Sequence, residues 1–199
     1  MKARTVADPV KLTMHARDGV LSGRTGRYEK RLADLDGLYR DKESFERARE
    51  NDTGEPVYWV EDSRLGGSGE LVTGLSVLEP GRIGDEFYMT RGHLHSLADR
   101  GELYLAVSGR GVMLLDDLSG GSRAIEIDVG EAVHVPGNWV HRSINVGKER
   151  FVTLFCYPAD AGQDYGIVAA AGGMRDLVIA DGAGWSTRPN PEHRGYGHV

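Results

Sequence analysis

The sequence predicts an all-β protein, built as an antiparallel sandwich or a small barrel and preceded by short helices and strands. Between residues 56 and 158, apolar and polar side chains alternate with period two in about ten short segments. Turn signals separate these segments at intervals of roughly 6–12 residues. The chain also has 28 glycines among its 199 residues, which suits tight turns between short strands. A barrel of this size can hold one small ligand.

Length and composition limit the organisation and the partners. We expect one domain over residues 1–199, with an N-terminal extension (1–55), a barrel core (about 56–158) and a C-terminal segment (159–199). The net charge of −6 argues against a nucleic-acid partner, because no basic surplus exists to displace counterions. Cys156 is the only cysteine, so no disulfide can form within the chain.

Neither a signal peptide nor a membrane span is expected. The first residues lack the apolar stretch of a signal peptide, and no apolar run approaches the roughly 18 residues that cross a bilayer. A cytoplasmic protein without a membrane partner is the expectation.

The N-terminal extension should contain two strands and two helices. Residues 10–14 alternate as in a strand, and residues 17–21 read as a turn into a second strand. Residues 27–38 place apolar side chains at helical spacing with charges between them. Residues 41–51 are polar around Phe45, which predicts a second short helix on the surface.

The core consists of strands bounded by glycine, proline and polar turns. The expected strands are residues 56–60, 71–78, 85–90, 103–107, 112–115, 124–129, 132–135, 141–145 and 151–157. From residue 188 the chain is rich in Pro, Gly, His and charge. We expect His193 and His198, in that tail, to be solvated.

Three residues close together in the sequence suggest a metal site. His93 and His95 are two positions apart, so on a strand both imidazoles point to one face. Glu102 follows on what should be a second strand, joined to the first by Ser96–Gly101. Imidazole and carboxylate together bind divalent Fe, Mn, Zn, Ni or Co. His141 is the candidate for a fourth ligand.

Two segments resemble the motifs of the cupin proteins. The spacing of Gly130, Pro136, His141 and Asn145 resembles the second cupin motif, with Asn138 where that motif usually has Gly. The spacing from His93 through Glu102 to Gly109 resembles the first motif, with a longer gap before the glutamate.

That longer gap and the segment Tyr157–Gly166 resemble the cupin-type glucose-6-phosphate isomerases of archaea and some bacteria. The likeness covers roughly residues 18 to 180. It implies a cupin double-stranded β-helix, a homodimer, and an enzyme of glycolysis and gluconeogenesis. It also implies one divalent metal ion per subunit, Fe²⁺ first among the candidates, held by His93, His95, Glu102 and His141.

The same resemblance implies a sugar-phosphate site. Thr90, Gly92 and Ser76 would line the phosphate end, with Arg91 nearby. Four tyrosines would line the pocket and bind hydroxyls: Tyr58, Tyr104, Tyr157 and Tyr165. From the sequence alone, these tyrosines could also be core residues. One departure concerns Gln163, which stands where the family commonly has His and cannot exchange a proton near neutral pH.

The implied reaction moves hydrogen between C1 and C2 of a hexose 6-phosphate. Glu102 and His141 are the expected catalytic residues, and Glu102 could act as ligand and base in a cis-enediol route. If Glu102 is only a ligand, a hydride shift is the alternative. Two other functions fit the same motifs: a cupin dioxygenase that activates O₂, and a sugar-phosphate-binding cupin without turnover.

Overall fold

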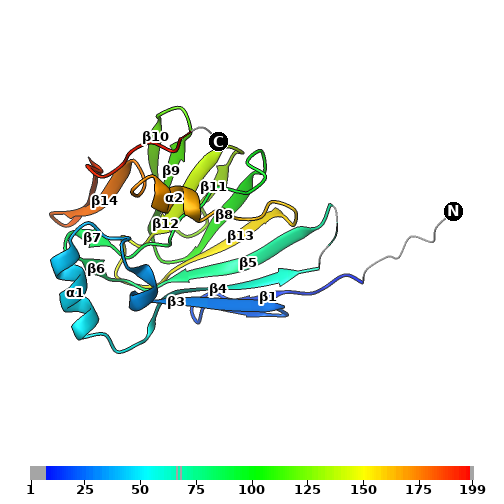
Figure 1. The fold of residues 1–199 in the computed structure, drawn as a ribbon. Helices are drawn as coiled ribbons and strands as arrows, with labels where there is room; N and C mark the ends of the chain where they lie inside the picture. Colours follow the sequence, from blue (N-terminus) through cyan, green and yellow to red (C-terminus); the bar gives the residue numbers. More distant parts are fainter. Residues whose placement is uncertain (1–7, 66, 68, 198–199) are drawn as a thin grey trace.

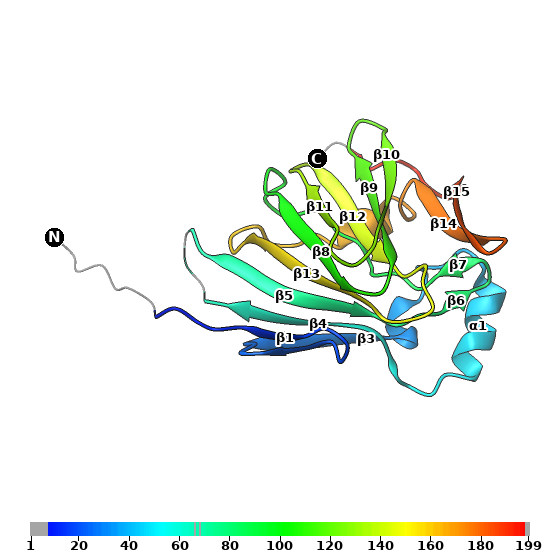
Figure 2. The ribbon, with the colours of Figure 1, turned by 180° about the vertical axis from the view of Figure 1, so that it is seen from behind.

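Two antiparallel sheets face each other in the structure, a computed structural model that describes residues 8–65, 67 and 69–197. The larger sheet has the strand order β11-β8-β13-β5-β4-β3. Its strands are β3 (Gly26–Arg31), β4 (Pro56–Arg64), β5 (Leu71–Leu78), β8 (Glu102–Ser108), β11 (Ala132–Val135) and β13 (Phe151–Pro158). Figure 2 shows these strands fanning out side by side. The smaller sheet joins β10 (Ser122–Ile127), β9 (Gly111–Asp117) and β12 (Trp139–Ile144).

The chain winds between the two sheets. It passes from β8 in the large sheet to β9 and β10 in the small one, then to β11, β12 and β13 in alternate sheets. This is the winding of a jelly roll, so the predicted all-β cupin double-stranded β-helix is confirmed. Among the described residues, no ladder joins the two sheets, and the fold is a sandwich.

A hairpin of the N-terminal extension covers part of the large sheet's outer face. It consists of β1 (Thr13–His15) and β2 (Val20–Ser22), as predicted. Leu21 of β2 is fully buried in a cluster with Trp59 and Val77. The Trp59 indole N–H donates to the Gly19 carbonyl at 3.0 Å, which fixes the hairpin on the sheet.

The helix expected over residues 27–38 is wrong. Residues 26–31 form β3 instead, and only Leu32–Leu35 turn as a short 3₁₀-helix, η1. Glu29 pairs with Arg31 at 2.8 Å and with Arg27 at 3.6 Å, so three charges at alternate positions share the outer face. The ladder with β4 satisfies the backbone hydrogen bonds of this segment. The spacing of its leucines, taken alone, had favoured a helix. The second predicted helix is confirmed as α1 (Lys42–Glu50), capped by Asp41.

The described part of the C-terminal segment contains three elements that were not predicted from the sequence. They are α2 (Gly166–Ala170), β14 (Asp176–Asp181) and β15 (Gly184–Pro189). The two strands join β6 (Arg82–Ile83) and β7 (Glu86–Phe87) in a four-stranded sheet. Figure 1 shows this sheet near α1, at one end of the sandwich.

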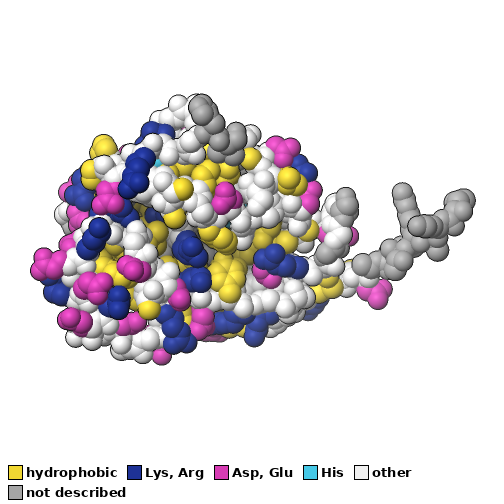
Figure 3. Space-filling view, in the orientation of Figure 1, with side chains coloured by type: hydrophobic (Ala, Val, Ile, Leu, Met, Phe, Trp, Pro, Cys, Tyr) yellow, Lys and Arg dark blue, Asp and Glu magenta, His cyan; other side chains and the backbone are white. Residues whose placement is uncertain are grey.

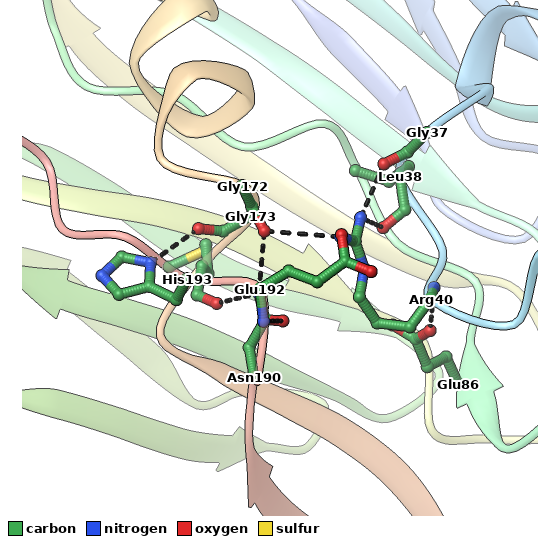
Figure 4. A network of polar contacts seen from close by, with 10 residues as sticks. Gly37, Leu38, Arg40, Glu86, Gly172, Gly173, Asn190, Glu192 and His193 are labelled. Carbon is green, nitrogen blue, oxygen red and sulfur yellow. Dashed lines mark hydrogen bonds and ion pairs between the residues drawn. The ribbon is translucent and has the colours of Figure 1, made fainter.

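The chain beyond β15 packs against the loop after α2 (Figure 4). The Asn190 amide donates to the carbonyls of Gly172 and Met174 at 3.0 and 2.8 Å. His193 bonds through Nδ1 to the Gly173 carbonyl at 2.9 Å and is only partly exposed, so the prediction that it is solvated is wrong. His198 lies outside the described residues. No helix in the described part of the chain has the length and hydropathy to cross a membrane.

Candidate metal centre

Glu102 opens β8 and points to the inner face of the large sheet. Glu102, Tyr104 and Ala106 are buried, whereas the intervening Leu103 is 43% exposed. This alternation is the one that the sequence predicts, and it places the carboxylate between the two sheets.

The histidine pair lies on an extended segment rather than on a regular strand. We expected a strand there, but the segment makes only isolated bridges, of which one joins His93 to His141 of β12. The two backbones exchange N–H···O bonds of 3.1 and 3.0 Å. His93 and His95 still share one side, with ring centroids 5.3 Å apart, because the backbone is extended.

The four predicted ligands converge at one buried point. Their ligand atoms all lie within 4.8 Å of one another. Glu102 Oε2 lies 3.0 Å from His141 Nε2, 3.2 Å from His95 Nε2 and 3.8 Å from His93 Nε2. The cluster joins both sheets, because Glu102 belongs to β8 and His141 to β12.

Hydrogen bonds behind the rings orient them for a metal. His95 donates from Nδ1 to the Arg100 carbonyl at 2.9 Å, and His141 donates from Nδ1 to the Trp139 carbonyl at 3.0 Å. Each bond leaves the Nε2 lone pair facing the cluster. His93 Nε2 is buried without a hydrogen-bond partner among the described residues. Three imidazole nitrogens and one carboxylate oxygen fit a divalent ion.

The ionisation of Glu102 and His93 also suits metal ligands. Burial raises the pKa of Glu102, but the adjoining His141 and His95 side chains outweigh burial and lower it to about 2. In His95 burial lowers the pKa, but the contacts with Glu102 and with the Arg100 carbonyl outweigh burial and raise it. Burial lowers the pKa of His93 well below its ordinary value. An ionised carboxylate and a neutral imidazole are the forms that bind metal.

A cavity opens beside this cluster, and all nine predicted substrate-binding residues line it. They are Tyr58, Ser76, Thr90, Arg91, Gly92, Tyr104, Tyr157, Gln163 and Tyr165. The cavity gives the centre of a water molecule about 40 Å³ of room. On the face of the molecule drawn in Figure 3, basic and hydrophobic side chains gather between α2 and β3–β4.

Two contacts join residues of the cavity wall. The Arg91 guanidinium lies 5.3 Å from the ring centroid of Tyr165. The Tyr165 hydroxyl donates to Gln163 Oε1 at 2.5 Å. Gln163, the departure from the family pattern, therefore holds a wall residue of the cavity.

The wall near Thr90 is built from paired segments. The Thr90 N–H donates to the Ser143 carbonyl at 3.0 Å, and the Ser143 N–H donates to Thr90 Oγ1 at 3.1 Å. Gly92 has a φ of +76°, and a Cβ there would lie 3.0 Å from the Arg142 Nε atom. Glycine at position 92 thus satisfies both the backbone and the space that buried Arg142 requires.

Sequence reasoning missed several lining residues. They are Tyr28, Val60, Asp62, Arg64, Arg142, Ser143 and Phe155. Tyr28 was missed because its segment was predicted to be a helix and not a strand of the sheet. Asp62 and Arg64 continue the period-two alternation of Tyr58 and Val60, so extending that strand to residue 64 would have found them.

Comparisons with known proteins point to one family. A family model described as "Glucose-6-phosphate isomerase (GPI)" matches residues 29–194. A glucose-6-phosphate isomerase of Sinorhizobium medicae (strain WSM419) is 44% identical over 189 residues, which are 94% of this chain and 88% of that protein. A glucose-6-phosphate isomerase of Thermococcus litoralis is 40% identical over 169 residues, 83% of this chain and 86% of that protein.

Among solved structures, one of Bacillus subtilis oxalate decarboxylase has a TM-score of 0.45 and 21% identity, covering 54% of this chain and 27% of that one. The family model spans most of the chain, and the two relatives each cover more than four fifths of it. This chain belongs to the glucose-6-phosphate isomerase family.

Proposed function

We propose that this protein interconverts glucose 6-phosphate and fructose 6-phosphate with one divalent metal ion. The observation that carries the proposal is the buried cluster of three histidines and Glu102 beside a polar cavity. His93, His95, Glu102 and His141 would hold the ion. When bound, the ion would supply a Lewis acid for the oxygens on C1 and C2 of the sugar.

The chain's own residues then have distinct tasks. The phosphate end would meet Ser76, Thr90 and Gly92, with Arg91 supplying positive charge. Tyr58, Tyr104, Tyr157, Gln163 and Tyr165 would bind hydroxyls and exclude water. Glu102 is the acidic group at the cluster, so we assign it the proton transfer between C1 and C2, with His141 fixing its position.

The physiological setting belongs to the same proposal. Relatives named glucose-6-phosphate isomerase support the sugar-phosphate reaction. The proposal places the enzyme in the cytoplasm, as a homodimer that acts in glycolysis and gluconeogenesis. Fe²⁺ is our first choice of metal, and Mn²⁺, Zn²⁺, Ni²⁺ and Co²⁺ share its ligand preferences.

A coupled assay of fructose 6-phosphate conversion, with metal analysis of the same preparation, tests the proposal. We expect treatment with EDTA to lower activity at least about 100-fold and added Fe²⁺ or Mn²⁺ to restore it. Full activity in demonstrably metal-free protein would refute the proposal. Oxygen consumption with a small organic substrate would instead favour the dioxygenase.

Gln163 gives a specific reason to consider a second function, sugar-phosphate binding without turnover. Gln163 lies in the cavity and accepts a hydrogen bond, but it cannot transfer a proton near neutral pH. This alternative predicts tight binding of fructose 6-phosphate with no conversion, and activity only after the change Gln163→His. Turnover by the natural sequence excludes it.

A further inference from the structure

One row of side chains on β4 faces the cavity. Tyr58, Val60, Asp62 and Arg64 occupy alternate positions of this strand, and all four line the cavity. Asp62 and Arg64 stand at the end of the row and have no part in the reaction as described above.

The carboxylate of Asp62 has one occupied oxygen and one free oxygen. Arg64 donates to Asp62 Oδ2 from Nε at 2.9 Å and from Nη2 at 2.7 Å. Asp62 Oδ1 is buried and has no hydrogen-bond partner among the described residues, and the residue is only 5% exposed. A buried carboxylate oxygen without a donor is costly, so this one calls for a ligand to complete it.

The neighbouring strand β3 leaves room for this oxygen. Asp62 pairs with Gly26 on β3 and with Gly74 on β5. A Cβ at Gly26 would lie 2.7 Å from Asp62 Oδ1. The backbone of Gly26 is outside the left-handed region, so only the space beside the carboxylate demands glycine there.

The charges suit a phosphorylated sugar. Arg64 balances the Asp62 carboxylate, so the pair does not repel a phosphate group. Ser76 of β5, assigned above to the phosphate end, pairs with Val60 of β4. Val60 precedes Asp62 by two residues on the same face of β4. Asp62 therefore stands beside the part of the substrate that adjoins the phosphate.

We propose that Asp62 Oδ1 accepts a hydrogen bond from a sugar hydroxyl between the reacting carbons and the phosphate. Arg64 holds the carboxylate in place for this contact. Asp62 is thus a residue that recognises the sugar chain, and the proposal rests on the function proposed above.

Two variants test this contact in different ways. In Asp62→Asn, Arg64 keeps the amide oxygen at the Oδ2 position, so the cavity meets an N–H donor instead of an acceptor. In Gly26→Ala, the carboxylate stays but its free oxygen is displaced. Glu29→Gln is the control, because it removes one carboxylate from the outer face of β3.

We expect both cavity variants to raise KM for fructose 6-phosphate at least about tenfold, with kcat within about threefold of the natural protein. Metal content and competitive inhibition by inorganic phosphate should not change, because the metal ligands and the phosphate end remain intact. The control should match the natural protein. A KM within about twofold for Asp62→Asn, or a loss confined to kcat, overturns the proposal.

A measurement of binding affinity tests this contact independently of whether the protein catalyses the proposed reaction. If the natural protein converts no sugar, calorimetry with fructose 6-phosphate on the natural protein and Asp62→Asn still decides the matter. At least about tenfold weaker binding to the variant supports the contact. Equal affinities, or no binding to either protein, overturn it.

Discussion

The carboxylate oxygen Glu102 Oε2 is the point where three imidazoles converge. Because Glu102→Gln keeps the size of the side chain but removes its charge, it isolates the contribution of that charge. We expect metal affinity to fall at least about 100-fold and isomerase activity to fall with it. Metal analysis after dialysis, together with the coupled assay, measures both.

The control for this variant is Glu43→Gln on α1. Glu43 is 85% exposed and pairs with Arg47 on the same helix, so neutralising it should alter neither metal content nor activity. A Glu102→Gln protein that retains its metal would contradict the ligand assignment.

Glu86 provides a prediction about pH. Burial raises the pKa of this carboxyl group, although the Arg40 N–H donates to it at 2.6 Å. The folded state therefore holds the proton more tightly than the unfolded chain. The resulting stabilisation is complete below the ordinary value of 4.5 and is lost as the pH rises through the folded-state pKa.

Above that range, folding must bury an ionised carboxylate. Glu86→Gln removes this cost, so we expect its Tm to exceed that of the natural protein by about 2–4 °C at pH 8. The difference should shrink toward pH 4, where Glu86 is protonated in both states. Thermal melts over this range measure it, and a difference that grows as the pH falls would show the reasoning to be wrong.

Some single residues could be predicted from the sequence because motifs fix them. Asn138, where the second cupin motif usually has Gly, adopts a φ of +66°, and Asn tolerates the left-handed region better than most residues. The free oxygen of Asp62 could not be predicted in this way. It depends on Gly26 of the neighbouring strand β3, and strand register is not visible in one strand's sequence.

At the scale of elements, regular alternation gave reliable predictions and leucine spacing did not. Among the described residues between 56 and 158, the structure has ten strands, β4 to β13, where about ten were predicted. In residues 27–38, leucine spacing favoured a helix, but the ladder with β4 decided the structure. The strands β14 and β15 were missed because their stability depends on β7, a partner far away in the sequence.

The C-terminal segment beyond β15 depends on Asn190, which is 6% exposed. Its Oδ1 accepts from the Glu192 N–H at 3.0 Å, in addition to the two bonds that its amide donates. Asn190→Ala removes the donor to the buried Met174 carbonyl and leaves the Gly172 carbonyl with only the longer bond of 3.4 Å from Arg40 Nη1 among the described residues. We expect a loss of about 2–4 kcal/mol in the free energy of unfolding, measured by urea denaturation.

Asn51→Ala is the matched control for this prediction. Asn51 is exposed, and its amide makes one bond, to the Arg47 carbonyl at 2.8 Å. Its replacement should change stability by no more than about 0.5 kcal/mol. Equal losses of unfolding free energy in the two variants would mean that the buried contacts of Asn190 stabilise the fold no more than the exposed contact of Asn51.

For the whole molecule, we expect a homodimer formed by faces of the sandwich and the N-terminal segment. The β1–β2 hairpin covers the outer face of the large sheet near Trp59. Farther along that sheet, Leu103 on β8 is 43% exposed and Leu71 on β5 is 54% exposed. Exposed leucines on a sheet face suit a subunit contact.

Light scattering after size-exclusion chromatography tests this expectation. The natural protein should elute at twice the mass of the chain, and Leu103→Asp should shift it to one chain. Val129→Asp is the control, because Val129 is 63% exposed near a turn. A monomer in the natural protein would remove the homodimer from the proposal. The organisation as one domain, with an N-terminal extension (1–55), a core (about 56–158) and a C-terminal segment (159–199), stays a prediction.

The ligand cluster joins the two layers, since Glu102 comes from one sheet and His141 from the other. A bound cation would therefore hold the two sheets together, and the free energy of its binding would add to the free energy of folding. Metal starvation in a cell would then do more than silence the enzyme. It would leave a looser protein that proteases remove sooner, so the supply of metal would set how much of the protein survives.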